Sequence, residues 1–173
     1  AQTAGIPLVL FNKEATEAGV MQLYDDVWYV GTQSRDAGII QGQMMVEDWQ
    51  ANPDWDKNGD GVVQYVLLKG EPGHPDAEAR TEYSVRQFVE AGIEVEELAL
   101  EADPNWSTQH GADTTAAWLT SSFGDEIELI IANNDGMAFG SITAMQAAAV
   151  SLPIYGVDAL DQALTHIADG EMN

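Results

Sequence analysis

A short segment between positions 56 and 64 carries oxygen side chains at alternate positions. Asp56, Asn58 and Asp60 stand at its first, third and fifth positions, and Gln64 stands at the ninth. Alternate oxygens around a tight turn point at one centre, and the backbone carbonyl of Val62 adds a further oxygen. Hard oxygen ligands in this pattern are typical of calcium sites. The segment therefore predicts a bound Ca²⁺ ion.

The calcium pattern lacks its last ligand. A helix–loop–helix calcium site has a glutamate at the twelfth position, where this chain has Leu67 inside an apolar run. A bidentate carboxylate must therefore come from elsewhere, and Glu128 is the candidate because it is the charge within the apolar run IELIIA. The alternative is that residues 56–64 form a solvated turn and that Glu128 lies on an exposed strand face.

The chain is strongly acidic. Its 173 residues include 29 Asp and Glu against 6 Lys and Arg, which gives a formal net charge of −23 at pH 7. Such a surface repels phosphate backbones and anionic lipids, so binding to nucleic acid or to a membrane surface is disfavoured. Disorder is disfavoured too, because 45% of the residues are hydrophobic and cluster into runs of strand length.

Two further features limit the class of protein. The chain has no cysteine, which excludes disulfides, thiol catalysis and thiolate metal sites. No apolar run approaches the roughly 18 residues of a membrane-spanning helix. No apolar stretch follows a basic start, so we expect no signal peptide in these residues.

Apolar runs of strand length alternate with amphipathic segments along the chain. Strands separated by helices of ten to fifteen residues or so predict an α/β fold, with a parallel sheet and helices on both faces. The first strand is expected to be buried. Strands are expected at 6–11, 27–31, 63–69, 93–100, 127–132 and 152–157, and helices at 36–50, 76–91, 108–121, 136–150 and 160–168.

Polar residues gather where the predicted strands end. Asn12, Lys13 and Glu14 follow the first strand, and the segment GEPGHPDAEAR follows the third. Asn134 and Asp158 follow the last two strands. In parallel sheets, ligands bind beyond the carboxyl ends of the strands. We therefore expect the binding site at this edge of the sheet.

Several segments together resemble the periplasmic galactose/glucose-binding proteins, the sugar receptors of ABC uptake and chemotaxis. They are FNKE, YVGTQSRDAGIIQG, DKNGDGVVQYVLLKGEPGHPDAEART, IANNDGMAFG and GVDAL, in the same order over almost the whole chain. The calcium loop followed by GEPGHPDAEAR is specific to that family. The resemblance implies two α/β lobes of the type I periplasmic-binding-protein kind, joined by three crossings, with the hexose between them.

The resemblance also implies which part of such a protein this chain is. Residues 1–31 correspond to a remnant of the first lobe with a hinge crossing, and residues 32–173 to the second, sugar-binding lobe with the calcium loop. The expected partners are a hexose, the membrane subunits of an ABC permease, and a missing N-terminal lobe or a second chain. The expected location is extracytoplasmic, in the periplasm or on the cell surface.

The resemblance further implies two sets of ligand residues. All six oxygen positions named above match calcium ligands of the family. Seven other positions match its sugar-binding residues, and their side chains suit a hexose, because carboxylates, amides and guanidinium bind hydroxyls and a flat indole covers an apolar ring face. These seven residues are Asn12, His74, Asp76, Arg80, Trp106, Asn134 and Asp158.

Each of these residues has a structural alternative. Asp76 and Asp158 are also suited to cap the helices that follow them. Arg80 lies one helical turn after Asp76, where an ion-pair partner would lie. Trp106, shortly after Pro104, is typical of a residue that packs a loop.

Three functions from different classes follow. The leading one is a non-enzymatic receptor that binds D-glucose or D-galactose and delivers it to an ABC permease, and to a chemoreceptor in some receptors of this family. The second is a calcium-binding structural module with little sugar affinity. The third is a hydrolase with a carboxylate pair, which is disfavoured because Glu128 is assigned to the metal and no Ser or Cys nucleophile pairs with a His. A sugar-responsive repressor is disfavoured because the chain lacks a helix-turn-helix and a basic patch.

Overall fold

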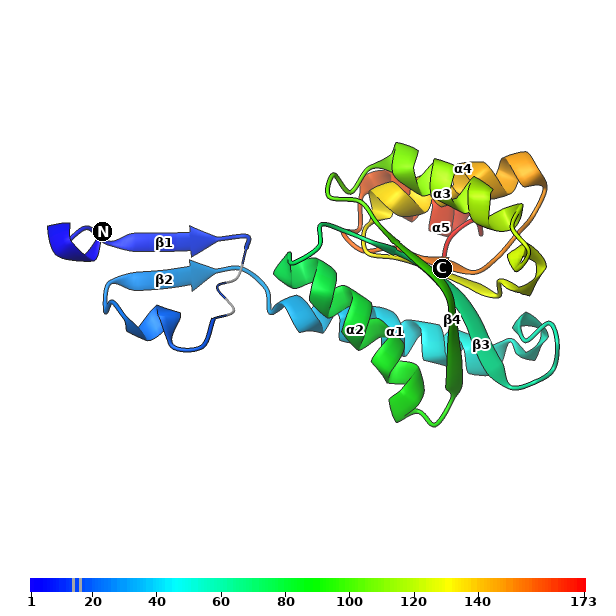
Figure 1. The fold of residues 1–173 in the computed structure, drawn as a ribbon, viewed down its shortest axis with the longest axis horizontal. Helices are drawn as coiled ribbons and strands as arrows, with labels where there is room; N and C mark the ends of the chain where they lie inside the picture. The colour runs from blue at the N-terminus through cyan, green and yellow to red at the C-terminus, as the bar shows by residue number, and fades with distance from the viewer. Residues whose placement is uncertain (14, 16) are drawn as a thin grey trace.

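The computed structural model describes residues 1–13, 15 and 17–173, which form two separate parallel sheets (Figure 1). Glu14, named above at the end of the first strand, lies outside the described residues. The smaller sheet pairs β1 (Leu8–Phe11) with β2 (Val27–Val30). The larger sheet has the order β4-β3-β5-β6. Its strands are β3 (Val62–Lys69), β4 (Glu94–Ala102), β5 (Leu129–Ala132) and β6 (Ile154–Tyr155).

Helices cover both faces of the larger sheet, which confirms the predicted α/β class (Figure 1). On one face lie α1 (Ser34–Ala51) and α2 (Pro75–Glu90), and on the other lie α3 (Thr108–Leu119), α4 (Asp135–Ala148) and α5 (Asp161–Ala168). Short 3₁₀ turns complete the described elements at Gln2–Ala4, Val20–Gln22, Pro53–Trp55 and Gly124–Glu126.

Strand β3 shows why both faces are covered. Its residues Val63 to Leu68 are all buried, and all of them except Gln64 are hydrophobic, as expected of a strand between two helical layers. Val66 and Leu68 join the core under α3 and α4, whereas Tyr65 and Leu67 join the core under α1 and α2. The alternation follows from the two-residue period of a strand.

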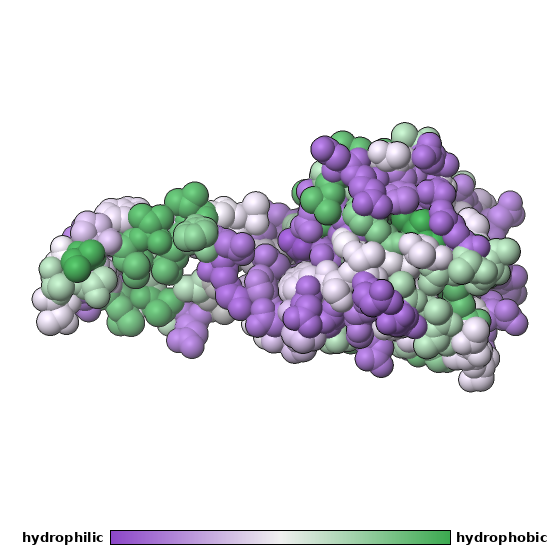
Figure 2. Space-filling view, turned by 90° about the horizontal axis from the view of Figure 1, so that it is seen from above, coloured by the Kyte–Doolittle hydropathy of each residue, from purple (hydrophilic) through white to green (hydrophobic). Residues whose placement is uncertain are grey.

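The smaller sheet differs from the prediction. The first strand was expected to be buried, but Val9 is 56% exposed and Phe11 is 76% exposed. The prediction is wrong for these residues because no helix of the described chain covers β1 and β2, so most of their apolar side chains are exposed. Figure 2 shows apolar residues gathered over this part of the molecule.

The two sheets are joined by residues 31–33, which lead from β2 into α1. A second link is the ion pair between Lys13 and Glu71, whose Nζ and Oε2 atoms lie 3.5 Å apart. The assignment of residues 1–31 to the first lobe of a two-lobed receptor stays a prediction. Within the described residues, none of the helices has the length and apolar content for crossing a membrane.

Candidate functional site

Six of the seven predicted sugar-binding residues lie together beyond the carboxyl ends of the larger sheet. Arg80, on the first turns of α2, is at the centre of the group, and its side chain is only 14% exposed. Its Nη1 atom donates a hydrogen bond of 2.7 Å to the carbonyl of Asn133. The same nitrogen lies 3.5 Å from Oδ1 of Asp158, and Nη2 lies 3.9 Å from Oδ2 of Asp76. Parallel strands thus bring together residues that are far apart in the sequence.

Arg80 also has an unused donor. Its Nε atom is buried and has no hydrogen-bond partner among the described residues. An unpaired donor of a buried charged group is costly, so an oxygen acceptor is expected beside it.

The indole of Trp106 completes the aromatic part of the group. Its ring centre lies 5.8 Å from the guanidinium carbon of Arg80 and 5.5 Å from the ring of His74, which stands edge-on at 81°. The indole also packs on the backbone at Gly70, where an added Cβ would come within 2.3 Å of the ring. Trp106 therefore packs its loop, as the structural alternative proposed, and lies within the polar group as well.

Two predicted residues are helix caps. His74 is the N-cap of α2, and its Nδ1 atom accepts a hydrogen bond of 3.2 Å from the amide of Asp76. The alternative that Asp76 caps this helix is therefore wrong. Since Nδ1 accepts, the neutral ring carries its proton on Nε2, which stays a donor. Asn134 is the N-cap of α4 through a 2.9 Å bond from Met137 N–H, and its Nδ2 donates to the Trp106 carbonyl at 3.2 Å.

Asp158 occupies an unusual backbone position. Its φ angle is +123°, a region that L-residues rarely adopt, and the N-cap of α5 is Leu160, so Asp158 is not the cap of that helix. Burial raises the pKa of its carboxyl, and the nearby Asp135 and Asp76 raise it further against the opposing effect of Arg80. A carboxylate held beside Arg80 in this way has oxygens that accept hydrogen bonds from hydroxyls.

Asn12 is the predicted sugar residue outside the group. It is exposed at the end of β1, with a φ of +66°, and its carbonyl accepts a 2.9 Å hydrogen bond from the hydroxyl of Tyr29. The hydrogen bonds and ring contacts that join the other six residues do not reach it.

Three residues that support the group had not been predicted. Asp103 shapes the loop before Trp106 by accepting hydrogen bonds from Asn105 N–H and from the amide and hydroxyl of Ser107. Asn133 is fully buried, and its Oδ1 accepts from Gly70 N–H at 3.1 Å. Asp135 is 2% exposed and bonds to the loop of Asp158. A polar side chain directly after a buried strand was the available signal for Asn133.

The predicted calcium loop closes on its own backbone. Asp56 accepts hydrogen bonds from Gly59 N–H at 2.8 Å and from Gly61 N–H at 3.0 Å. Asp60 accepts a hydrogen bond of 2.8 Å from Val62 N–H and one of 3.0 Å from the side-chain amide (Nε2) of Gln64. An ionised carboxylate has about four acceptor sites, so each of these carboxylates keeps capacity for a cation.

Glu128 lies beneath this loop and is 1% exposed, so the alternative of an exposed strand face is wrong. Its Oε1 accepts from Lys57 N–H at 2.6 Å and its Oε2 from Gln64 N–H at 3.2 Å. Burial raises the pKa of this carboxyl, and the charges of Asp56 and Asp60 raise it further. A buried carboxylate near two others favours a neighbouring cation.

The side chain of Gln64 helps to decide whether the residues of this loop fit a cation. Its Oε1 atom is buried and has no hydrogen-bond partner among the described residues. This oxygen is an available hard ligand for a cation such as Ca²⁺, although it is the Nε2 atom of the same amide that faces Asp60 in this structure. In this structure, however, no three Asp, Glu or His side chains of the described residues gather closely enough to hold a metal ion.

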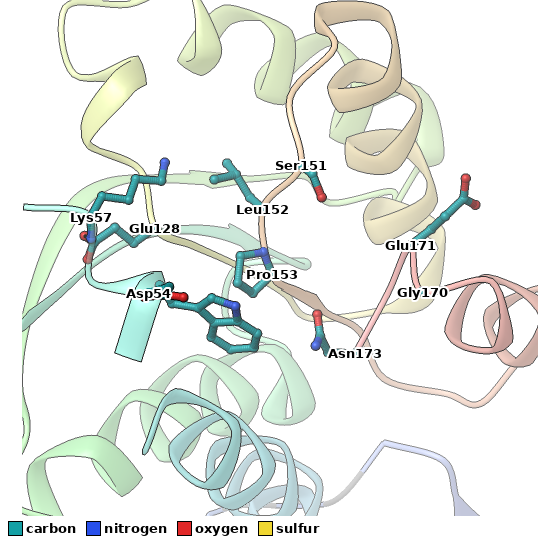
Figure 3. Close-up of a pocket in the computed structure, with 10 residues that line it drawn as sticks. Asp54, Lys57, Glu128, Ser151, Leu152, Pro153, Gly170, Glu171 and Asn173 are labelled. Carbon is teal, nitrogen blue, oxygen red and sulfur yellow. Dashed lines mark hydrogen bonds between the residues drawn. The ribbon is translucent and has the colours of Figure 1, made fainter. Parts of the chain in front are cut away.

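Cavities lie at several places around the larger sheet. Figure 3 shows one of about 270 Å³ at the amino-terminal edge of the larger sheet, where Lys57 lies beside Glu128 and Asn173 lies at the other end. A second hollow of about 280 Å³, mostly apolar, lies between α1 and α5 next to Asp158. Among the predicted sugar residues of the larger sheet, Asp158 lines this second hollow.

Comparison with known proteins gives a consistent result. Residues 1–173 match the model of the periplasmic binding protein domain. The D-galactose/methyl-galactoside binding periplasmic protein of Haemophilus influenzae is 46% identical over 172 residues, which are 99% of this chain and 51% of that protein. A putative rhizopine-binding protein of Rhizobium meliloti is 32% identical over 100% of this chain and 52% of its own length. This chain thus spans about half the length of these relatives.

Solved structures share the fold. A galactofuranose binding protein aligns with a TM-score of 0.80 at 18% identity, over 99% of this chain and 55% of that protein. A solute binding protein of Bacillus halodurans with bound myo-inositol aligns with a TM-score of 0.77 at 27% identity, over 99% of this chain and 54% of that one. The first likeness concerns the fold alone.

Proposed function

Because this chain belongs to the periplasmic binding protein family, we propose that it forms the sugar-binding lobe of an extracytoplasmic receptor for a hexose. The observation that carries the proposal is Arg80, which lies between Asp76 and Asp158 with a buried and unpaired Nε beside Trp106. A relative that is 46% identical binds D-galactose and methyl-galactoside, which supports D-galactose or D-glucose as the ligand. The receptor would deliver its sugar to an ABC permease, and a chemoreceptor is a second proposed partner.

The proposed binding uses each group for what its chemistry allows. Arg80 donates from a rigid fork, and the carboxylates of Asp76 and Asp158 accept from the same hydroxyls. His74 donates from Nε2, while the indole of Trp106 lies against the apolar C–H face of the sugar. These contacts hold and orient the hexose without forming or breaking a bond, so the proposed activity is binding and not catalysis.

We also propose that a calcium ion binds at the loop before β3. Asp56, Asn58, Asp60, the Val62 carbonyl, Gln64 and Glu128 would hold it. When bound, Ca²⁺ supplies positive charge that offsets the three carboxylates. Hydrogen bonds from Lys57 N–H and Gln64 N–H hold the carboxylate of Glu128 under the loop. The side-chain oxygen of Gln64 has no partner among the described residues. The site would fasten the loop to the start of β5.

The proposed hexose site is tested on the 173-residue chain by NMR shift titration in saturating Ca²⁺. We expect D-glucose and D-galactose to shift the Trp106 indole signal with a Kd of about millimolar or weaker, because most of the candidate contacts come from one side of the sugar and solvent stays in contact with them. Sorbitol, an acyclic polyol, should leave the signal unchanged. Equal shifts with all three, or none at about 100 mM, would contradict the proposal.

The second candidate function is a calcium-binding structural module. The closed loop over the buried Glu128 supports it independently of any sugar. Stabilisation by Ca²⁺ together with the absence of sugar shifts would favour this function over the receptor.

A further inference from the structure

The loop after β6 has a backbone that needs support. Asp158 has a φ angle of +123° and Ala159 one of +57°. Residues with a side chain adopt such angles at a cost in free energy, and they persist only when the surrounding structure holds them. Asp158 belongs to the proposed sugar site, so whatever holds this loop also sets the position of its carboxylate.

Asp135 holds the loop from both ends. It is the first residue of α4 and is 2% exposed. Its backbone N–H donates a 2.8 Å hydrogen bond to the carbonyl of Val157. Its Oδ2 accepts a 2.9 Å hydrogen bond from Leu160 N–H. These bonds enclose Asp158, which stands between the bonded residues.

A glycine makes this close approach possible. A Cβ atom at Gly156 would lie 2.5 Å from Oδ1 of Asp135, so any larger residue there would displace the carboxylate. The side chain of Asp135 is therefore fitted against the start of the loop as well as bonded to its end.

Support of the loop has a direct consequence for the sugar site. The Asp158 carboxylate lies 3.5 Å from Nη1 of Arg80, and its side chain is 40% exposed, so its oxygens can meet a ligand. A loop that is free to leave its left-handed backbone would carry Asp158 away from Arg80. A ligand would then have to restore the arrangement out of its own binding energy.

We propose that Asp135 is a positioning residue, which fixes the loop 156–160 and so holds the Asp158 carboxylate beside Arg80 for hexose binding. The consequence for sugar rests on the proposed function. The support of the loop itself rests only on the hydrogen bonds of Asp135.

Asp135→Ala tests the proposal in two independent measurements on the 173-residue chain. Without sugar, the Leu160 amide should exchange its hydrogen more than about tenfold faster, while the Ile130 amide in the core, bonded to the Pro153 carbonyl, should change only with global stability. With D-galactose, the Trp106 shift titration should show at least about tenfold weaker binding. If both measurements match the wild type, the proposal is wrong.

Two further variants separate positioning from a general loss of stability. Ser141→Ala removes another buried polar group from α4 that bonds to Thr115, and it should leave the Leu160 exchange and the sugar titration unchanged. Adding Ala159→Gly to Asp135→Ala should recover part of the affinity, because glycine adopts a φ of +57° without strain. If Ser141→Ala weakens sugar binding as much, or glycine gives no recovery, the positioning role is wrong.

The remaining outcomes are also decisive. If Asp135→Ala does not fold, Asp135→Asn takes its place, because its oxygen still accepts one of the loop amides; it should show intermediate exchange at Leu160. If the wild-type chain shows no sugar shifts while Leu160 is released in Asp135→Ala, the support of the loop is upheld and the hexose function fails.

Discussion

The guanidinium carbon of Arg80 lies 5.8 Å from the ring centre of Trp106, within the range of a cation–π contact. The two residues come from different connections of the sheet, since Arg80 is on α2 after β3 and Trp106 follows β4. The contact places the main donor of the proposed site against its main apolar surface. A sugar ring that packs on the indole therefore has its rim hydroxyls within reach of the guanidinium.

We expect Arg80→Lys to weaken hexose binding by about tenfold or more. A lysine carries one compact charge and cannot bond to the Asn133 carbonyl while facing both Asp76 and Asp158. Hydrogen bonds to charged groups contribute about 1.5–3 kcal/mol each. The NMR titration measures the loss.

The matched control is Arg86→Lys on the same helix, where the arginine is half exposed and pairs with Glu90. It should bind sugar like the wild type. If Arg80→Lys and Arg86→Lys both retain wild-type affinity, Arg80 is not a sugar ligand.

Calcium should raise the melting temperature of the chain. A ligand that binds only the folded state adds about 2.7 kcal/mol at a hundredfold excess over its Kd. Melting followed in EGTA and in millimolar Ca²⁺ should differ by several degrees, roughly 2–4 °C per kcal/mol for a chain of this size.

Glu128→Gln should remove most of this calcium-dependent shift, because it removes the charge of the buried carboxylate. Glu126→Gln, in the exposed turn just before β5, should keep the shift. Identical melts with and without Ca²⁺ in the wild type would rule out the site.

The larger sheet could be predicted from the sequence because its signals are local. Each apolar run of β3 and β5 is buried on both faces, and each following helix shows its own period and end signals, such as Gly92 after α2 with a φ of +77°. The burial of β1 could not be predicted in this way. An apolar run indicates a strand, but the strand is buried only if another element packs on it. In the described chain no element covers Val9 or Phe11.

The grouping of the sugar residues could also be expected from parallel topology, which brings strand ends to one edge. Their individual roles could not. Whether His74 or Asp76 caps α2 depends on the backbone of the Gly73–Pro75 turn, which the residue types leave open. The bonds of Asp135 to the loop of Asp158 depend on the register of β5 beside β6, a tertiary relationship that no local pattern encodes.

The acidic surface should make the fold respond to salt. With a net charge of −23, repulsion between surface carboxylates opposes the compact state. Salt at 0.1 M already limits such repulsion to about 10 Å, and molar salt limits it further. In calcium-saturated protein we therefore expect a higher melting temperature in molar KCl than at low ionic strength. A flat or falling melting temperature over this range would argue against the idea.

Helices α3 and α4 approach closely through two glycines. A Cβ at Gly111 would lie 2.3 Å from the Met137 carbonyl oxygen, and one at Gly140 would lie 2.0 Å from the Thr108 carbonyl oxygen. Alanine at either position should therefore destabilise the chain by about 1–3 kcal/mol, although alanine favours helices. Gly136→Ala, whose nearest atoms are 3.3 Å away, is the control and should cost much less. Urea unfolding measures the free energy of unfolding of each variant. Equal values for all variants would show that α3 and α4 can move apart without loss of stability.

Asp158→Asn should stabilise the chain at pH 7 while it weakens sugar binding. Burial raises the pKa of Asp158 above its value in the unfolded chain, so the folded state binds this proton more tightly. The resulting stabilisation is complete below the unfolded pKa of about 4 and is lost as the pH rises through the folded pKa. At pH 7 the ionised carboxylate therefore costs stability, and asparagine removes that cost.

Asp113→Asn, exposed on α3, makes the same change in net charge and is the control. Melts from pH 4 to pH 7 should show a smaller fall for Asp158→Asn than for the wild type or the control; a fall of equal size in all three would mean that Asp158 titrates alike in the folded and unfolded chain.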